Sequence, residues 1–169
     1  MMANSMIRAA TAAPMPLVDD IGGLRRILAQ TRTIAVVGLS AHWHRPSYFA
    51  AKYMQDHGYT IIPVNPAYRE VLGQVCYPDL ASIPGPVDMV DCFRKPADIE
   101  PIAHAAVAKG ARVLWLQLGI RNDAAAQVAL AGGLDVVMDR CVKIEHARIL
   151  GGLNLAGVNT GMISARRAG

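Results

Sequence analysis

The segment that most constrains the fold is a short apolar stretch, Thr33–Val37, that ends at Gly38 and leads into a loop carrying Ser40, Arg45 and Ser47. A helical pattern begins at the end of that loop. In α/β proteins, a strand that stops at a glycine and re-enters a helix presents free backbone N–H groups to a phosphate. The segment therefore predicts a β-α unit that binds a nucleotide-type ligand.

The same loop lacks the glycines of a dinucleotide site. A Gly-x-Gly-x-x-Gly fingerprint would place glycines where Ser40 and Trp43 stand, and only Gly38 is present. The next apolar segment ends at Asn65-Pro66, where an NAD site usually has an acid, and Arg69 follows. An Asn near an Arg would tolerate a ribose phosphate, and the alternative is a strand end that only turns the chain. We therefore keep an NAD(P)-dependent oxidoreductase only as the alternative interpretation.

Strand-like and helical patterns alternate along the chain. Apolar runs predict strands at 33–38, 60–64, 87–93, 112–118 and 134–138, and helical spacing predicts helices at 18–30, 47–57, 96–109 and 122–131. The proline- and glycine-rich segment 66–86 is expected to hold one short strand and one short helix around 79–83. Continuous apolar strands separated by helices indicate an α/β, Rossmann-like, doubly wound parallel sheet of about five strands with helices on both faces.

Length and composition bound the organisation and the partners. The 169 residues fit one domain, which we place at 17–150, between a flexible tail at 1–16 and a glycine-rich tail at 151–169. The net charge of +4 is scattered along the chain, which argues against a nucleic-acid partner. No apolar run approaches the roughly 20 residues that span a bilayer. Three widely spaced cysteines favour reduced thiols and a cytoplasmic location.

In a parallel sheet, ligands bind beyond the carboxyl ends of the strands, and two further segments fall there. Phe93-Arg94-Lys95 combines a ring that could flank an adenine with two cations that could reach a phosphate. The opposite interpretation is a core phenylalanine with two solvated cations. Gln117, followed by Gly119, is a polar residue in an apolar run, so it either has an internal partner or faces the cleft.

Catalytic and metal-binding patterns are weak. The spacing of His42 and His44 does not match that of a closed zinc site, so no metal is expected. Cys141 precedes His146 by five residues, which makes a nucleophilic Cys-His arrangement conceivable, but core packing is the stronger interpretation. We see no complete catalytic constellation, and the chain leans toward a non-catalytic role.

Several blocks taken in order resemble a known family. These blocks are VVGLS with Arg45-Pro46-Ser47, IPVNP at 62–66, Val87-Asp88, FRKP at 93–96, WLQLG at 115–119 and VMDRCVKIEH at 137–146. Over about 18–150 the chain resembles the small bacterial CoA-binding domain proteins, which are similar to the amino-terminal domain of the succinyl-CoA synthetase alpha subunit.

The resemblance implies a Rossmann-like fold with coenzyme A over the strand ends. The diphosphate would lie at Gly38, Leu39, Ser40 and the start of the first crossover helix, and the 3′-phosphate near Asn65, Pro66 and Arg69. Adenine would contact the segment around Phe93 and Arg94, and the pantetheine arm would pass Gln117 and Gly119.

We therefore expect a binder of coenzyme A or an acyl-CoA that performs no chemistry alone. An interaction module without a small ligand is a further alternative. The carboxy-terminal tail could close over the ligand or pack against a second subunit or a protein partner, and flexibility is its default interpretation.

Overall fold

The computed structural model describes residues 16–152, which form a five-stranded parallel sheet in the order β2-β1-β5-β6-β7. The strands are β1 (Thr33–Val37), β2 (Thr60–Val64), β5 (Met89–Cys92), β6 (Val113–Leu116) and β7 (Asp135–Val137). Every neighbouring pair is parallel. The predicted fold class is thus confirmed. The tails predicted at 1–16 and 151–169 fall almost entirely outside the described residues.

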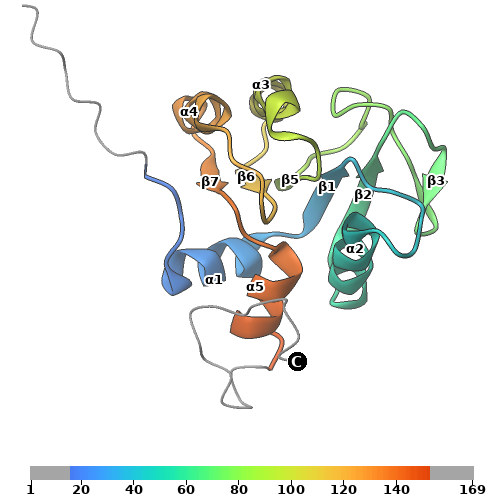
Figure 1. Ribbon diagram of the computed structural model, residues 1–169, viewed down its shortest axis with the longest axis horizontal. Coiled ribbons are helices and arrows are strands. Elements are labelled where there is room, and N and C mark those ends of the chain that lie inside the picture. The colour runs from blue at the N-terminus through green and yellow to red at the C-terminus, as the bar shows by residue number, and fades with distance from the viewer. Residues whose placement is uncertain (1–15, 153–169) are drawn as a thin grey trace, which may run out of the picture.

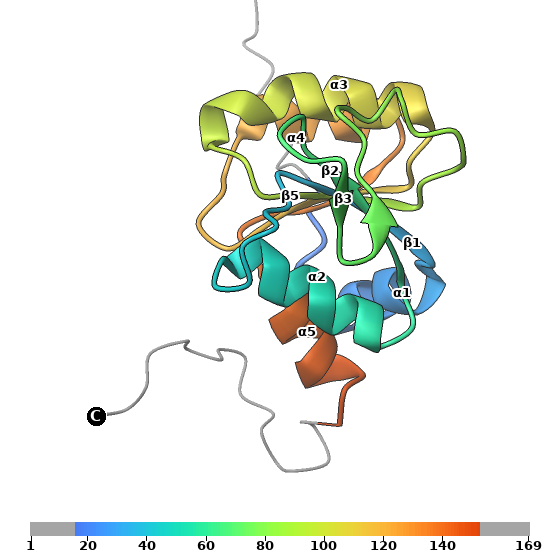
Figure 2. The same ribbon diagram turned by 90° about the vertical axis from the view of Figure 1, so that its right-hand side faces the viewer.

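Helices cover both faces of the sheet (Figures 1 and 2). One face carries α1 (Ile21–Gln30), α2 (Pro46–Asp56) and α5 (Val142–Ile149), and the other carries α3 (Ile99–Lys109) and α4 (Asp123–Ala131). Each face has its own apolar cluster, because strand side chains alternate between the two faces. None of the helices in residues 16–152 is long and apolar enough to cross a membrane.

Local signals in the sequence determine where several helices begin and end. Asp20 caps α1, its Oδ2 accepting from the Gly23 amide at 2.9 Å, and Asn122 caps α4 in the same way. Gly110 ends α3 in the left-handed conformation, with φ of 75°. These boundaries were predictable because a cap depends on residues adjacent in sequence.

The segment 66–86 differs from the prediction. It holds two short antiparallel strands, β3 (Glu70–Val71) and β4 (Gln74–Val75), and no helix at 79–83. Asp79 instead accepts hydrogen bonds from the amide and the hydroxyl of Ser82, both at 2.8 Å, which closes a local turn. Prolines 84 and 86 then prevent a helix from continuing. A short 3₁₀ turn, η1 (Pro96–Asp98), also precedes α3, so the helix predicted from 96 starts later.

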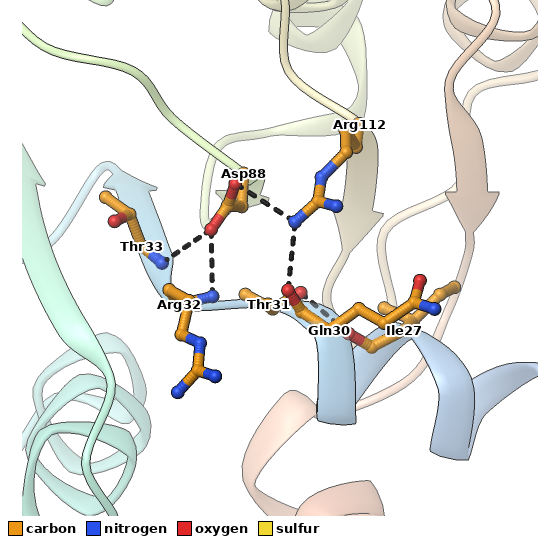
Figure 3. A network of polar contacts seen from close by, with 7 residues as sticks. All are labelled: Ile27, Gln30, Thr31, Arg32, Thr33, Asp88 and Arg112. Atoms are coloured by element: carbon orange, nitrogen blue, oxygen red, sulfur yellow. Dashed lines mark hydrogen bonds and ion pairs between the residues drawn. The ribbon is translucent and has the colours of Figure 1, made fainter.

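A polar network holds the amino edge of the sheet together (Figure 3). Asp88 precedes β5, and its Oδ2 accepts from the backbone amides of Arg32 at 2.9 Å and Thr33 at 3.1 Å. Its Oδ1 lies 3.1 Å from Nη2 of Arg112, which also donates to the Gln30 carbonyl at 2.9 Å. The network joins the end of α1 to the starts of β1, β5 and β6.

Candidate functional site

The carboxyl edge of the sheet gathers the predicted site segments. The chain leaves β1 for its neighbour β2 on one side and then returns to β5 on the other side, so the winding direction reverses between β1 and β5. In open α/β sheets, this reversal opens a crevice above the strand ends. The loops after β1, β2 and β5 therefore border the natural ligand site of this fold.

Gly38 is required where β1 meets this crevice. Its φ is +88°, and a Cβ at this position would lie 2.7 Å from the Phe93 carbonyl oxygen and 3.2 Å from Nε of Arg94. No other residue could bring the β1–α2 loop so close to the segment after β5. The glycine thereby sets the first predicted phosphate loop directly beside Arg94.

The protein itself uses several of the donors predicted to hold phosphate. The Gly38 amide donates to the Val64 carbonyl at 2.8 Å, and the Ser40 amide donates to Oγ of Ser47 at 3.0 Å. Ser47 is buried, and the Leu39 side chain lies in the core. Ser40 in turn accepts from the His42 amide through its hydroxyl. Ser40 and Ser47 thus shape the loop.

Other donors remain at the mouth of α2. Within residues 16–152, the backbone N–H groups of Leu39 and Ser47 have no hydrogen-bond partner. The Arg45 side chain is exposed, makes no capping hydrogen bond and forms no ion pair with a described residue. A free amide at the helix start beside a guanidinium, with a second free amide on Leu39 after β1, is suited to an anion.

The loop after β2 is tied to the loop after β1. Asn65 donates from Nδ2 to the Leu39 carbonyl at 3.1 Å, and its Oδ1 accepts from the Ala67 amide at 2.9 Å. Both functional atoms of the Asn65 side chain are therefore engaged within the protein. Pro66 and Arg69 are exposed, so Arg69 is the group from this loop that can meet an anion.

A cavity of about 410 Å³ opens at the ends of β1 and β2, on the face covered by α3. It is lined by Val37, Val64, Pro78, Asp79, Leu80, Arg94, Asp98, Pro101, Ile102 and Ala105. Arg94 alone among these was a predicted site residue. Phe93 packs on the opposite face, against the α1/α2/α5 cluster, and Lys95 is exposed. Consecutive residues of an extended segment point to opposite sides, which explains the separation of Phe93 from Arg94.

The character of this cavity favours a flat, uncharged group. Its walls are mostly apolar, and Arg94 stands beside two carboxylates, Asp79 and Asp98. The two hydrogen bonds from Ser82 lower the pKa of Asp79, so this carboxyl is ionised at neutral pH. Two negative charges would repel a phosphate, whereas an aromatic base could bury its faces against the apolar wall.

Gln117 has an internal partner. Its Nε2 donates to Oδ1 of Asp91 at 2.6 Å, and both side chains are buried. Burial raises the pKa of Asp91 to about 7, although the Gln117 hydrogen bond acts in the opposite direction. Of the two interpretations left open by the sequence, the structure shows the internal partner. Leu118 and Gly119 next to it are exposed at the edge.

Cys141 and His146 do not form a nucleophile-base pair. Cys141 stands at the start of α5, and burial raises the pKa of its thiol. The His146 ring bonds away from it, with Nδ1 3.0 Å from the Tyr53 hydroxyl on α2. Burial lowers the pKa of His146. Cys76, Cys92 and Cys141 are free thiols, and residues 16–152 contain no metal-binding group of His, Cys, Asp and Glu.

Sequence reasoning missed the loop 78–80 and the α3 residues that line the cavity. The loop lies in a segment predicted as irregular, and the other residues lie on one face of a helix. Neither the loop nor the helix carries a ligand motif. Asp98, just before α3, makes no capping hydrogen bond and lines the cavity, but the sequence alone does not distinguish it from a helix cap.

Comparisons with known proteins identify a family and several relatives. A family model described as "CoA binding domain" matches residues 32–147. A Bacillus subtilis protein described as "Uncharacterized protein YneT" is 41% identical over 124 residues, which cover 73% of this chain and 92% of that protein. A solved structure of a hypothetical protein from Pyrococcus horikoshii is 39% identical, with a TM-score of 0.77, over 80% of this chain and 96% of that one.

A more distant relative is an enzyme that is much longer than this chain. An acetate–CoA ligase (ADP-forming) of Archaeoglobus fulgidus is 36% identical over 58 residues, which are 34% of this chain and only 8% of the ligase.

Proposed function

The chain belongs to the CoA binding domain family, and on this premise we propose that it binds coenzyme A or an acyl-CoA at the carboxyl edge of its sheet. The resemblance found in the sequence motifs is thereby confirmed at the level of the family. The observation that carries the proposal is the 410 Å³ cavity beside the Gly38 loop, at the point where the winding of the sheet reverses.

Three features supply places for the parts of such a ligand. The apolar cavity beside Arg94 takes the adenine, and the free amides of Leu39 after β1 and of Ser47 at the start of α2, together with Arg45, take the diphosphate. Arg69, exposed on the loop after β2, meets the 3′-phosphate. The pantetheine arm follows the exposed backbone at Leu118 and Gly119. Gln117 supports this edge from below through Asp91 and makes no side-chain contact with the arm.

We propose binding without chemistry of its own. The raised pKa of Cys141 keeps its thiol protonated, and the hydrogen bond to Tyr53 holds His146 away from it. The protein then serves as a carrier or a sensor of the ligand.

Titration calorimetry with coenzyme A, acetyl-CoA and NADH tests the proposal. Saturable binding of coenzyme A or its thioester is expected, with no binding of NADH. Arg45→Ala weakens that binding about tenfold, because a charge-assisted hydrogen bond to phosphate is lost. Arg25→Ala removes an equally exposed charge from α1 and leaves the affinity unchanged. Failure of both coenzyme A and acetyl-CoA to bind at millimolar concentration would reject the proposal, and binding of NADH alone would favour the oxidoreductase.

Tryptophan fluorescence can locate the ligand. The chain has two tryptophans, of which Trp43 on the β1–α2 loop is 71% exposed and Trp115 in β6 is fully buried. We expect coenzyme A to change the emission of the wild type. In Trp43→Phe the change disappears while calorimetric binding persists, as a ligand at this loop requires.

A further inference from the structure

The motif Asp139-Arg140-Cys141 follows β7, and the proposed ligand contacts leave its first residue without a role. Asp139 has φ of +59°, in the left-handed region that side-chain-bearing residues avoid, and it is one of two such non-glycine residues among residues 16–152. Backbone strain of this kind persists only where the surroundings enforce it, and it concentrates at functional sites. The position therefore calls for a specific explanation.

Asp139 contacts the loop that leaves the neighbouring strand. Its Oδ1 accepts from the Gly119 amide at 2.6 Å, and its Oδ2 lies 3.8 Å from Nη1 of Arg121. The side chain is 38% exposed, so the carboxylate sits at the edge of the sheet and not in the core. The strained backbone thus serves to bring a carboxylate to the loop after β6.

Arg140 ties the same turn to the end of β6. Its amide donates to the Leu116 carbonyl at 3.3 Å, and its own carbonyl accepts from Nε1 of the buried Trp115 at 2.7 Å. These backbone contacts do not depend on the Asp139 side chain. Removal of that carboxylate should leave the turn itself in place.

Gly119 lies in a turn at the exposed edge of the sheet and has no side chain to pack. It is exposed, its φ is +83°, and a Cβ at this position would meet no atom within 4 Å. Gln117, two residues earlier, is anchored by Asp91 and by its carbonyl, which accepts from the Ile120 amide at 2.9 Å. That bond closes a turn whose central residues are Leu118 and Gly119, and the Asp139 carboxylate fastens this turn to the segment after β7.

We propose that Asp139 is a positioning residue, which holds the Leu118–Gly119 backbone in place for the amide-containing arm of the ligand. This inference rests on the proposed function, in which a CoA-type ligand crosses this edge. Asp139 acts through Gly119 and does not touch the nucleotide end, so it contributes to recognition of the arm alone.

Two ligands separate the arm from the nucleotide. Coenzyme A carries both parts, whereas adenosine 3′,5′-bisphosphate carries the nucleotide without the pantetheine. Asp139→Gly removes the carboxylate and suits the positive φ, so it is expected to fold. Asp139→Asn keeps an oxygen that can accept from the Gly119 amide and also tolerates the left-handed region.

Calorimetry on the full chain is the test, with thermal melting as the check on folding. In Asp139→Gly the affinity for coenzyme A falls about tenfold, while the affinity for the bisphosphate stays within twofold of the wild type. Asp139→Asn restores most of the affinity for coenzyme A. An equal fall for both ligands, or unchanged affinity for both, overturns the positioning role while the proposed function stands. A wild type that binds neither ligand overturns the proposed function and this inference with it.

Discussion

Asp88 lies just before β5 and Asp91 lies near the carboxyl end of the same strand, and the pKa values of the two carboxyls are shifted in opposite directions. Asp88, at the amino edge, accepts from two backbone amides and pairs with Arg112 (Figure 3). Partial burial works to raise the pKa of Asp88, but these partners outweigh it and the pKa is lowered. Asp91 is buried toward the carboxyl edge with only the Gln117 amide, and its pKa is raised to about 7.

The difference shows that the two edges of the sheet use a carboxyl group in different ways. At the amino edge an ionised carboxylate with three donors ties four elements together and serves stability. At the carboxyl edge a buried carboxyl with one neutral donor is costly to ionise, and it lies beneath the segment proposed to meet the ligand. The amino edge carries the Asp88 network, and the carboxyl edge carries the crevice and Asp139 with its positive φ.

Asp91→Asn should have the largest effect. A carboxyl with a raised folded-state pKa contributes stability that is complete below its unfolded pKa near 3.8 and is lost as the pH rises through about 7. Over that interval the wild type loses roughly 4 kcal/mol. The Asn variant keeps an acceptor for Gln117 and lacks this loss, so it is the more stable protein at pH 8.

Urea unfolding at pH 4, 6 and 8 measures the effect of Asp91→Asn. The gap between variant and wild type should widen with pH. A gap that stays constant between pH 4 and pH 8 would show that Asp91 is ionised throughout and would break the contrast with Asp88.

Gly38→Ala extends the comparison of the two edges to the backbone, because it tests a glycine at the carboxyl edge. The substitution combines a positive φ with a Cβ 2.7 Å from the Phe93 carbonyl oxygen, so it should destabilise the protein by about 3 kcal/mol. Gly58, before β2 at the amino edge, has φ of +93° but open space around it. Gly58→Ala is the matched control and should cost only about 1 kcal/mol. Equal losses in thermal or urea unfolding would mean that the close approach at Gly38 does not matter.

Asp88→Ala should have a smaller effect at neutral pH, about 2 kcal/mol, because two backbone amides lose their acceptor. A carboxyl with a lowered pKa contributes stability that is present above pH 3.8 and is lost as the pH falls through the folded value. The difference from wild type should therefore shrink as the pH falls below 3.8, opposite in direction to Asp91→Asn.

Arg112→Gln provides the smallest expected effect at the same network. Its side chain is 57% exposed, so loss of the ion pair should cost less than about 1 kcal/mol. A loss as large as that of Asp88→Ala in urea unfolding would assign the stability of the amino edge to the ion pair and not to the amide hydrogen bonds.

Much of the fold was predictable because its signals are local. The strand that runs up to Gly38 and the helix ends at Gln30, Lys109 and Ala131 depend on neighbours in sequence, and each was found where expected. The helix predicted at 79–83 was wrong because Asp79 can either start a helix or close a turn with Ser82. The same residues are compatible with both conformations.

The sequence predicted that the candidate site lies at the carboxyl edge of the sheet, but it did not predict which side chains face that site. The sequence placed Phe93 and Arg94 together, but an alternating backbone sends one to each face, and only packing decides which one meets the cavity. Likewise, the side chains of Asn65 and Ser47 could hydrogen-bond a ligand, yet both are hydrogen-bonded to backbone groups of the β1–α2 loop.

The order of apolar strands and helices by itself determined a doubly wound sheet with its ligand edge at the carboxyl ends, because periodicity and chain handedness are properties of consecutive residues. Only the tertiary structure decided which polar groups remain free at that edge. Whether a donor meets a ligand or the protein's own carbonyl depends on segments far apart in sequence, as the bonds of Gln117 to Asp91 and of Gly119 to Asp139 show.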